Sequence, residues 1–256
     1  MKRIVTALFL IPLFCYIVLV APPWAFLVTV AAVAVLCFYE FGDLVAAHGL
    51  AKPGVFGYVA GLLLLLIPGR EAALVTLIAI GAMALALRSS ELTRALPSGA
   101  ALLLGVVYVF GSLRTAVVLR AINVYWLFFA LSLNWAGDIA AFYVGRAIGR
   151  HKLAPEVSPG KSWEGAGASV VASVLYGAFY FHWLLPAVPL IEALGLTVVA
   201  NVAGQLGDLC ESAIKRGAGV KDSGRLLPGH GGWLDRVDSS LFAMPVVYFV
   251  VSNFGW

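Results

Sequence analysis

Charged side chains are scarce in this sequence, and their scarcity excludes a soluble globular protein. Asp, Glu, Lys and Arg make up 12% of the chain and apolar residues make up 62%, whereas about 25% of the residues in soluble domains are charged. So few charges could not cover the outer surface of a water-soluble core built from 256 residues. We therefore expect most of the surface to face lipid.

Cysteine is also scarce, which excludes two further classes of protein. The three cysteines, Cys15, Cys37 and Cys210, lie far apart, and none belongs to a CxxC or Cys/His motif. This spacing argues against a disulfide framework and against a thiolate metal site. A small-x-small cleavage motif is missing after the apolar run of residues 4–20, so we expect a retained first membrane helix rather than a signal peptide.

Long apolar runs predict a bundle of membrane helices. A spanning helix needs about 20 mostly apolar residues, and nine candidate segments are found. They cover residues 4–20, 24–42, 54–68, 71–88, 99–119, 123–147, 165–185, 189–213 and 239–255. The runs do not alternate with a period of two, so β-strands are disfavoured. The predicted fold class is all-α, a polytopic transmembrane helical bundle of about nine spans.

The basic residues predict how this bundle is oriented. With the N-terminus in the cytoplasm and nine spans, all but three of the 17 Lys and Arg residues fall on the cytoplasmic side; the exceptions are Arg70, Arg114 and Arg120. Such an asymmetry follows the positive-inside rule. We expect residues 1–125 to form about five N-terminal spans, and residues 126–256 to form a catalytic region with two polar cytoplasmic loops.

Two predicted spans carry polar residues that are costly in a membrane. Asn134 and Asp138 lie at i and i+4 in the first of them. In the second, spacings of four and three residues predict one continuous polar helical face. Its members are Asn201, Gln205, Asp208, Ser212 and Lys215. Hydrogen bonds between helices explain the amides as well as a function does, whereas Asp208 needs a cation, from a divalent metal or a loop arginine.

The first polar loop, residues 146–164, is basic and contains Gly160-Lys161-Ser162. These residues resemble the end of a P-loop, but Pro155 stands at the position of the first glycine and no strand is predicted before it. We therefore reject a P-loop. Lys161 and the N-terminus of the following helix still offer positive charge to an anion. The alternative is a basic loop that only sets topology or contacts anionic lipid.

The second polar loop, residues 214–238, combines carboxylates with cations. Asp235 and Asp238 lie at i and i+3, so they can project from one helical face. Together with Asp208 they offer three oxygen ligands, which suit Mg²⁺. The cations of this loop are Lys215, Arg216, Lys221, Arg225 and Arg236. Carboxylates for a metal beside cations for phosphate are typical of phosphoryl or nucleotidyl transfer. The alternative, an Asp pair that caps a helix, leaves Asp208 unexplained.

The spacing of these residues closely resembles a family signature. Phosphatidate cytidylyltransferases, also called CDP-diacylglycerol synthases, have a signature similar to Ser212-x-x-Lys215-Arg216, Lys221-Asp222 and Pro228-x-His230-Gly231-Gly232-x-x-Asp235-Arg236-x-Asp238. Supporting segments are Trp135-x-x-Asp138, Ser158-Pro159-x-Lys161-Ser162-x-Glu164-Gly165 and Gly207-Asp208-Leu209-x-Glu211-Ser212. The resemblance covers roughly residues 130–240, and residues 1–125 match only in hydropathy. Trp233 and Gly160 depart from the family pattern, and Gly160 replaces a lysine that could contact phosphate.

The resemblance implies transfer of the cytidylyl group of CTP to phosphatidate, in the bacterial inner membrane with the active site facing the cytoplasm. It implies Mg²⁺ as cofactor, with a second cation left open, and a homodimer without a nucleic-acid partner. Catalytic roles are implied for Asp208, Asp235, Lys215 and Lys161. The implied metal ligands are Asp208, Asp235, Asp238 and Asp138, and the implied substrate-binding residues are Arg216, Lys221, Asp222, His230, Arg236, Ser212 and Ser158.

Two alternative functions are weighed against this one. A CDP-alcohol phosphotransferase-like membrane enzyme would consume the product of the reaction, but the Asp-Gly, Ala-Arg, Gly and two-Asp pattern of that class is absent. A cation-coupled transporter could use Asp138 and Asp208 as ion sites. It predicts internal repeats with paired broken helices, and the two halves of the sequence show no repeat.

Overall fold

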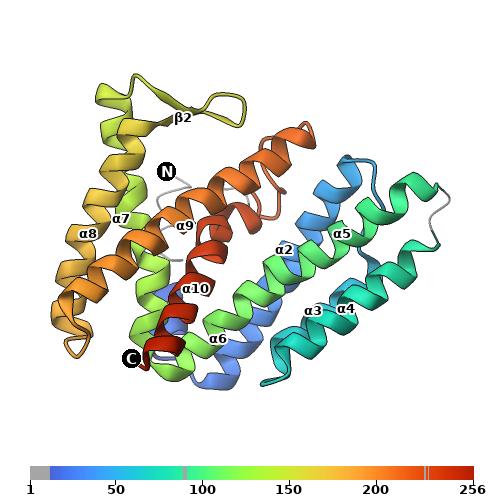
Figure 1. Ribbon diagram of the computed structural model, residues 1–256, viewed down its shortest axis with the longest axis horizontal. Helices are drawn as coiled ribbons and strands as arrows, with labels where there is room; N and C mark the ends of the chain where they lie inside the picture. Colours follow the sequence, from blue (N-terminus) through green and yellow to red (C-terminus); the bar gives the residue numbers. More distant parts are fainter. Residues whose placement is uncertain (1–11, 89–90, 228, 230) are drawn as a thin grey trace. The chain divides into compact units, whose positions relative to one another are not determined.

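The computed structural model describes residues 12–88, 91–227, 229 and 231–256, and helices dominate it (Figure 1). Residues 12–19 are helical and precede α2. The helices are α2 (Pro23–Ala47), α3 (Gly54–Leu66), α4 (Glu71–Ala86), η1 (Leu92–Arg94), α5 (Ala95–Gly105), η2 (Val106–Gly111), α6 (Ser112–Ile122), α7 (Val124–Ile148), α8 (Trp163–Leu184), α9 (Leu190–Gly217) and α10 (Leu234–Phe254). The predicted helical class is therefore confirmed.

Six helical stretches of the described chain are long and apolar enough to cross a membrane. They are α2, the stretch Leu92–Ile122, α7, α8, α9 and α10. The predicted segments 54–68 and 71–88 correspond to α3 and α4, which have only 13 and 16 residues. At a rise of 1.5 Å per residue these two helices reach only ~20 and ~24 Å, short of the hydrocarbon thickness of about 30 Å. Most of the predicted segment 4–20 lies outside the described residues.

A π-helical turn, η2, interrupts the stretch from Leu92 to Ile122. The turn contacts α3, where Gly61 leaves room for the ring of Phe110, because a Cβ at Gly61 would overlap that ring. Val106, Val109 and Phe110 are buried as a result. A π turn adds a residue to the helical repeat without changing hydropathy, so the sequence predicts an uninterrupted helix at this position.

The first polar loop contains a β-hairpin, which the sequence did not predict. Strand β1 (Lys152–Ala154) pairs antiparallel with β2 (Ser158–Ser162), with Lys152 opposite Ser162. The hairpin is short and polar, so it lacks the apolar alternation that marks a half-buried strand. Ser162 ends it and also caps α8, since its hydroxyl accepts the N–H of Gly165 at 3.1 Å. Lys161 therefore belongs to a strand that runs directly into a helix.

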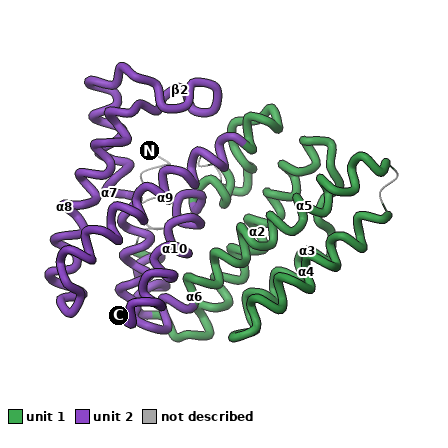
Figure 2. The backbone as a smooth tube through the Cα atoms, viewed as in Figure 1, with its two compact units in different colours: residues 1–13, 21–117, 214–236 green, residues 14–20, 118–213, 237–256 purple. Residues whose placement is uncertain are grey.

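The chain divides into two compact units, coloured separately in Figure 2. In the described chain, unit 1 contains residues 12–13, 21–117 and 214–236, and unit 2 contains residues 14–20, 118–213 and 237–256. The second polar loop thus groups with the N-terminal helices, and the predicted division at residue 125 stays a prediction.

Aromatic rings fill the core of each unit. In unit 1 the ring of Phe38 lies 5.2 Å from that of Phe110, and in unit 2 the ring of Phe129 lies 4.8 Å from that of Phe181. Both pairs meet edge to face, the geometry that aromatic side chains prefer. Each polar cluster described below is therefore carried by helices with a rigid apolar core.

Candidate active site

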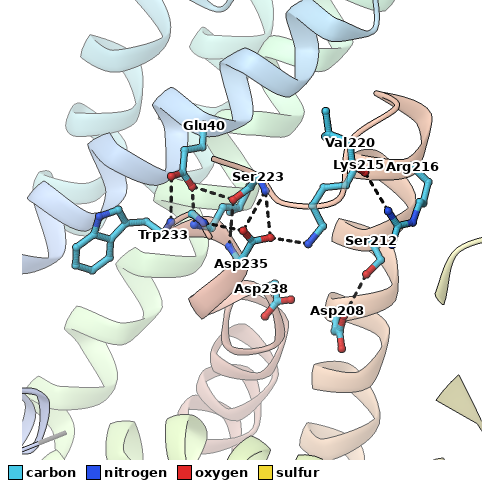
Figure 3. Close-up of polar contacts among 12 residues, drawn as sticks. Glu40, Asp208, Ser212, Lys215, Arg216, Val220, Ser223, Trp233, Asp235 and Asp238 are labelled. Carbon is cyan, nitrogen blue, oxygen red and sulfur yellow. Dashed lines mark hydrogen bonds and ion pairs between the residues drawn. The ribbon is translucent and has the colours of Figure 1, made fainter. Parts of the chain in front are cut away.

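In unit 2, the hairpin brings a lysine to a carboxylate on α9. Lys161 Nζ lies 2.5 Å from Asp208 Oδ2, and the side chains are 27% and 32% exposed. The hydroxyl of Ser212, one helical turn further on, donates to Asp208 Oδ1 at 3.2 Å (Figure 3). Asp208 thus has the cation that its position in an apolar helix requires. That cation is a hairpin lysine, whereas the sequence left open a metal or an arginine.

The base of the hairpin is fixed by a histidine to which the sequence analysis gave no role. His151 Nδ1 lies 2.7 Å from Glu164 Oε1, and the backbone N–H of His151 also donates to this carboxylate. Glu164 stands in the first turn of α8, where a negative charge is favoured by the helix dipole. The contact joins both ends of the hairpin to one helix and so holds Lys161 near Asp208.

The amides of α9 have structural partners. Asn201 Nδ2 donates to Ser169 Oγ at 3.0 Å and to Ser173 Oγ at 2.9 Å. Gln205 Nε2 donates in turn to Asn201 Oδ1 at 2.7 Å. The Asn201 bonds are buried and join α9 to α8, and Gln205 Nε2 also reaches the Ala166 carbonyl of α8 at 3.4 Å. These contacts favour helix association over a catalytic role for the two amides. The neighbouring α7 approaches at Gly137, where a Cβ would overlap Ser169 Oγ.

The remaining acidic candidates of unit 2 lie near Asp208 or on α10. Asp138 of α7 is exposed and interacts electrostatically with Asp208 and Lys161. Asp238 Oδ1 accepts the N–H of Ser239 at 2.7 Å. The backbone of α10 at Asp238 packs closely on α9, because a Cβ at Gly207 would lie 2.7 Å from the Asp238 carbonyl oxygen. Unit 2 therefore brings Asp138, Asp208 and Asp238 onto adjacent helices.

In unit 1, a second lysine–carboxylate pair organises the second polar loop (Figure 3). Lys215 Nζ lies 2.6 Å from Asp235 Oδ1, and the two side chains are only 11% and 6% exposed. Asp235 also accepts the N–H of Ser223 at 3.0 Å and the N–H of Gly232 at 2.8 Å, both on Oδ2. Both carboxylate oxygens of Asp235 are thus hydrogen-bonded, and the loop folds around them.

Glu40 of α2 contacts the same loop, a role that the sequence did not predict. Its side chain is 1% exposed and accepts the hydroxyl of Ser223 at 2.9 Å and the N–H groups of Trp233 and Leu234 at 3.1 and 2.9 Å. A signal was available, because a carboxylate inside a predicted apolar span is a functional candidate by the rule that selected Asp138 and Asp208. It was overlooked because residues 1–125 resemble the family only in hydropathy.

The other predicted substrate-binding residues lie at the surface. Arg216 donates to the carbonyl of Val220 at 3.2 Å and closes the turn after α9. Lys221 and Asp222 are exposed in the loop, Arg236 is exposed in the first turn of α10, and Ser158 is partly exposed at the start of β2. Exposed cations leave room for a polyphosphate to approach. His230 lies outside the described residues.

Each of the two clusters offers a carboxylate that could serve as a ligand for a hard cation. Each carboxylate already holds one positive charge, from Lys161 on Asp208 and from Lys215 on Asp235, and carboxylate oxygens are ligands that Mg²⁺ prefers. Within the described parts of the chain, no three Asp, Glu, His or Cys side chains gather closely enough to hold a metal ion. The three-carboxylate magnesium site therefore stays a prediction.

Comparison with known proteins gives a consistent result. A model of the cytidylyltransferase family matches residues 1–254. A phosphatidate cytidylyltransferase of Bacillus subtilis is 44% identical over 155 residues, which cover 59% of this chain and 57% of that protein. One of Brucella suis is 36% identical over 230 residues, or 85% of this chain and 80% of that protein. One of Haemophilus influenzae is 46% identical over 123 residues, or 46% of this chain and 43% of that protein.

Proposed function

Because this chain belongs to the cytidylyltransferase family, we propose that it transfers the cytidylyl group of CTP to phosphatidate, giving CDP-diacylglycerol and pyrophosphate. The observation that carries the proposal is the pair of lysine–carboxylate contacts, Lys161 with Asp208 and Lys215 with Asp235. Each contact places a lysine, which could bind phosphate, beside a carboxylate, which could bind a metal ion. The family match favours this reaction over a phosphotransferase or a transporter.

The reaction needs charge neutralisation more than it needs a base. A phosphate oxygen of phosphatidate attacks the α-phosphorus of CTP, the bond from that phosphorus to the bridging oxygen breaks, and pyrophosphate leaves with the bonding electron pair. The attacking oxygen is already anionic near neutral pH, so no proton has to be removed. The difficulty is the repulsion between a triphosphate and a phosphomonoester, which fixed cations offset.

In this scheme, the basic residues of the chain would bind phosphate and its carboxylates would bind the cation. Lys161 and Lys215 would turn from their carboxylates to substrate phosphates, with the exposed Arg216, Lys221 and Arg236 beside them. Mg²⁺, when bound by Asp208, Asp235 and Asp238 with Asp138 as a further ligand, would neutralise phosphate charge. Ser158, Ser212, Asp222 and His230 complete the proposed substrate-binding set.

The proposed orientation places both polar loops in the cytoplasm of a bacterium, where CTP is made. The chain is an integral membrane protein, with the N-terminus proposed to be cytoplasmic and with nine spans if the predicted segment 4–20, α3 and α4 all cross. These two short helices form a consecutive pair, so they can cross the bilayer twice or re-enter it without changing the orientation of α5 and later helices. The proposed assembly is a homodimer in the inner membrane.

A reconstituted assay tests the proposed function. Purified protein in mixed micelles should release pyrophosphate from CTP only when phosphatidate and Mg²⁺ are both present, and CDP-diacylglycerol should accumulate in equal amount. Asp208→Asn should abolish turnover while the protein stays monodisperse. Asp43→Asn is the matched control, because Asp43 forms an exposed ion pair with Lys52. Full turnover by Asp208→Asn would contradict the assignment, and consumption of CDP-diacylglycerol in place of its formation would favour the phosphotransferase.

A further inference from the structure

A buried carboxylate on α2, that of Glu40, accepts hydrogen bonds from uncharged groups of the second polar loop. Glu40 accepts the Ser223 hydroxyl and the backbone N–H groups of Trp233 and Leu234 (Figure 3). Those two N–H groups stand at the N-terminus of α10, which begins at Leu234. The N-terminal end of a helix carries a partial positive charge and unpaired N–H donors. The Glu40 carboxylate therefore caps α10 from another helix.

Two glycines of the loop are fitted to this carboxylate. At Gly224 and at Gly232, a Cβ atom would overlap the Glu40 oxygens. The loop backbone thus approaches Glu40 more closely than any residue with a side chain would allow. Gly224 directly follows the donor Ser223 and Gly232 directly precedes the donor Trp233, so the close fit and the hydrogen bonds point to one function, holding the loop against α2.

Ser223 connects Glu40 to the candidate catalytic pair. Its hydroxyl donates to Glu40 and accepts the N–H of Asp235 at 3.3 Å, while its own N–H donates to the Asp235 carboxylate. Asp235 in turn holds Lys215. A continuous chain of hydrogen bonds therefore runs from Glu40 through Ser223 to the atoms that are proposed to meet phosphate and cation, all within unit 1.

We propose that Glu40 is a positioning residue, whose carboxylate fixes Ser223 and the start of α10 and thereby sets the geometry of Asp235 and Lys215 for the reaction. This inference rests on the proposed function. A carboxylate suits the task because it only accepts hydrogen bonds and has two oxygens for three donors, whereas a glutamine of the same shape would present one NH₂ group to donors. Glu40 itself touches no substrate in this scheme.

The test combines kinetics with a measure of loop order that does not depend on turnover. Glu40→Gln and Ser223→Ala are compared with wild type and with Asp43→Asn, a matched loss of a carboxylate one turn away on the same helix whose partner is the exposed Lys52. For each monodisperse protein, kcat and KM for CTP are measured. Trypsin cleavage after Lys221 and Arg225, two exposed basic residues in the middle of the loop, is followed in parallel.

Glu40→Gln should lower kcat/KM for CTP about 10- to 100-fold, the range expected when reacting groups are misplaced by about 1 Å. It should also speed cleavage in the loop, and Asp43→Asn should change neither value. The Glu40→Gln/Ser223→Ala double variant should be no slower than the slower single variant, because both changes break one connection. If Glu40→Gln cannot be isolated in folded form, the same kinetic and cleavage measurements on Ser223→Ala, which removes only the connecting hydroxyl, decide the question.

Two results would overturn the inference. One is wild-type kcat/KM in the folded Glu40→Gln protein, whatever its cleavage rate, since a merely structural anchor would leave the kinetics of the folded fraction unchanged. The other is a fold-loss of kcat/KM in the double variant equal to the product of the losses in the two single variants, which would show that Glu40 and Ser223 act independently. If wild-type protein forms no CDP-diacylglycerol, the proposed function fails and the kinetic claim fails with it, while the cleavage rates still decide whether Glu40 holds the loop.

Discussion

Asp208 and Asp235 show how two residues of one signature can differ in environment. Asp208 is partly exposed, forms an ion pair with one lysine and accepts a hydrogen bond from one hydroxyl. Asp235 is nearly buried, forms an ion pair with a lysine and accepts hydrogen bonds from two backbone N–H groups. Their spacing in the sequence made both of them metal-ligand candidates of equal standing. The structure gives Asp235 a second task, because the fold of its loop depends on it.

This difference predicts unequal losses of stability. Asp235→Asn removes the negative charge that lies 2.6 Å from the nearly buried Lys215 ammonium, which should cost about 3 kcal/mol, whereas Asp208→Asn breaks a more accessible pair that contributes about 1 kcal/mol. The temperature at which half of the detergent-solubilised protein aggregates should therefore fall clearly further for Asp235→Asn. Equal shifts for the two variants would contradict the structural task assigned to Asp235.

Lys161 gives a second prediction at this scale. Lys161→Met should lower kcat/KM for CTP by about 100-fold, the loss typical of removing one electrostatic contact to the transition state. Lys152→Met is the control, because Lys152 is an exposed lysine on the other strand of the same hairpin. A larger loss for Lys152→Met than for Lys161→Met, measured by pyrophosphate release at several CTP concentrations, would show that the wrong strand has been assigned.

Among the elements, the long apolar helices could be predicted from the sequence and the irregular ones could not. The segments predicted at 123–147 and 165–185 correspond closely to α7 (Val124–Ile148) and α8 (Trp163–Leu184), because lipid requires continuous apolar runs. The hairpin at Lys152–Ser162 and the π turn at Val106–Gly111 leave no mark on hydropathy. Lys161 and Asp208 could be nominated from the sequence, but their pairing depends on that hairpin.

Glu40 shows the same limit in another form. Its residue type was a readable signal, but its partners lie 183 to 194 positions away in the chain, and only tertiary structure joins them. No local pattern reports on such a contact. The candidate site could thus be predicted where its residues share a helix or a motif, and could not where a distant helix supplies the support.

The contact of α7 with α8 and α9 predicts a sharp difference between two glycines. Gly137→Ala should push α7 away from Ser169 and Asn201, since its Cβ would meet both side chains; overpacking of this kind costs about 1–3 kcal/mol. Gly167→Ala on α8 should be neutral or slightly stabilising, because nothing lies within 4 Å of its Cβ. Thermal aggregation of the two variants measures the contrast, and an equally tolerated Gly137→Ala would argue against this packing.

On the scale of the whole molecule, the order of the helices predicts which compartment each polar segment faces. The β-hairpin follows α7 and the second polar loop follows α9, with α8 and α9 between them. Two crossings return the chain to its starting side, so both polar segments should face the same compartment. This conclusion does not depend on whether α3 and α4 cross the membrane.

Labelling of single cysteines tests this orientation. In a background lacking Cys15, Cys37 and Cys210, cysteines introduced at Glu156 in the hairpin turn and at Val220 after α9 should both react with a membrane-impermeant maleimide in inside-out vesicles. Neither should react in intact spheroplasts. If the two positions were labelled from opposite sides, one of the helices α8 and α9 would not cross the membrane. The two polar segments could then not share an active site.

The length of α9 determines where a water-soluble nucleotide can contact the headgroup of a membrane lipid. Its 28 residues extend ~42 Å, whereas the hydrocarbon layer measures about 30 Å. If its first turn begins at the far boundary, the last two turns stand in the headgroup zone with Lys215 and Arg216. The length of α9 then sets how far above the hydrocarbon layer the reacting phosphates lie. A phospholipid headgroup could reach the nucleotide without its acyl chains leaving the bilayer.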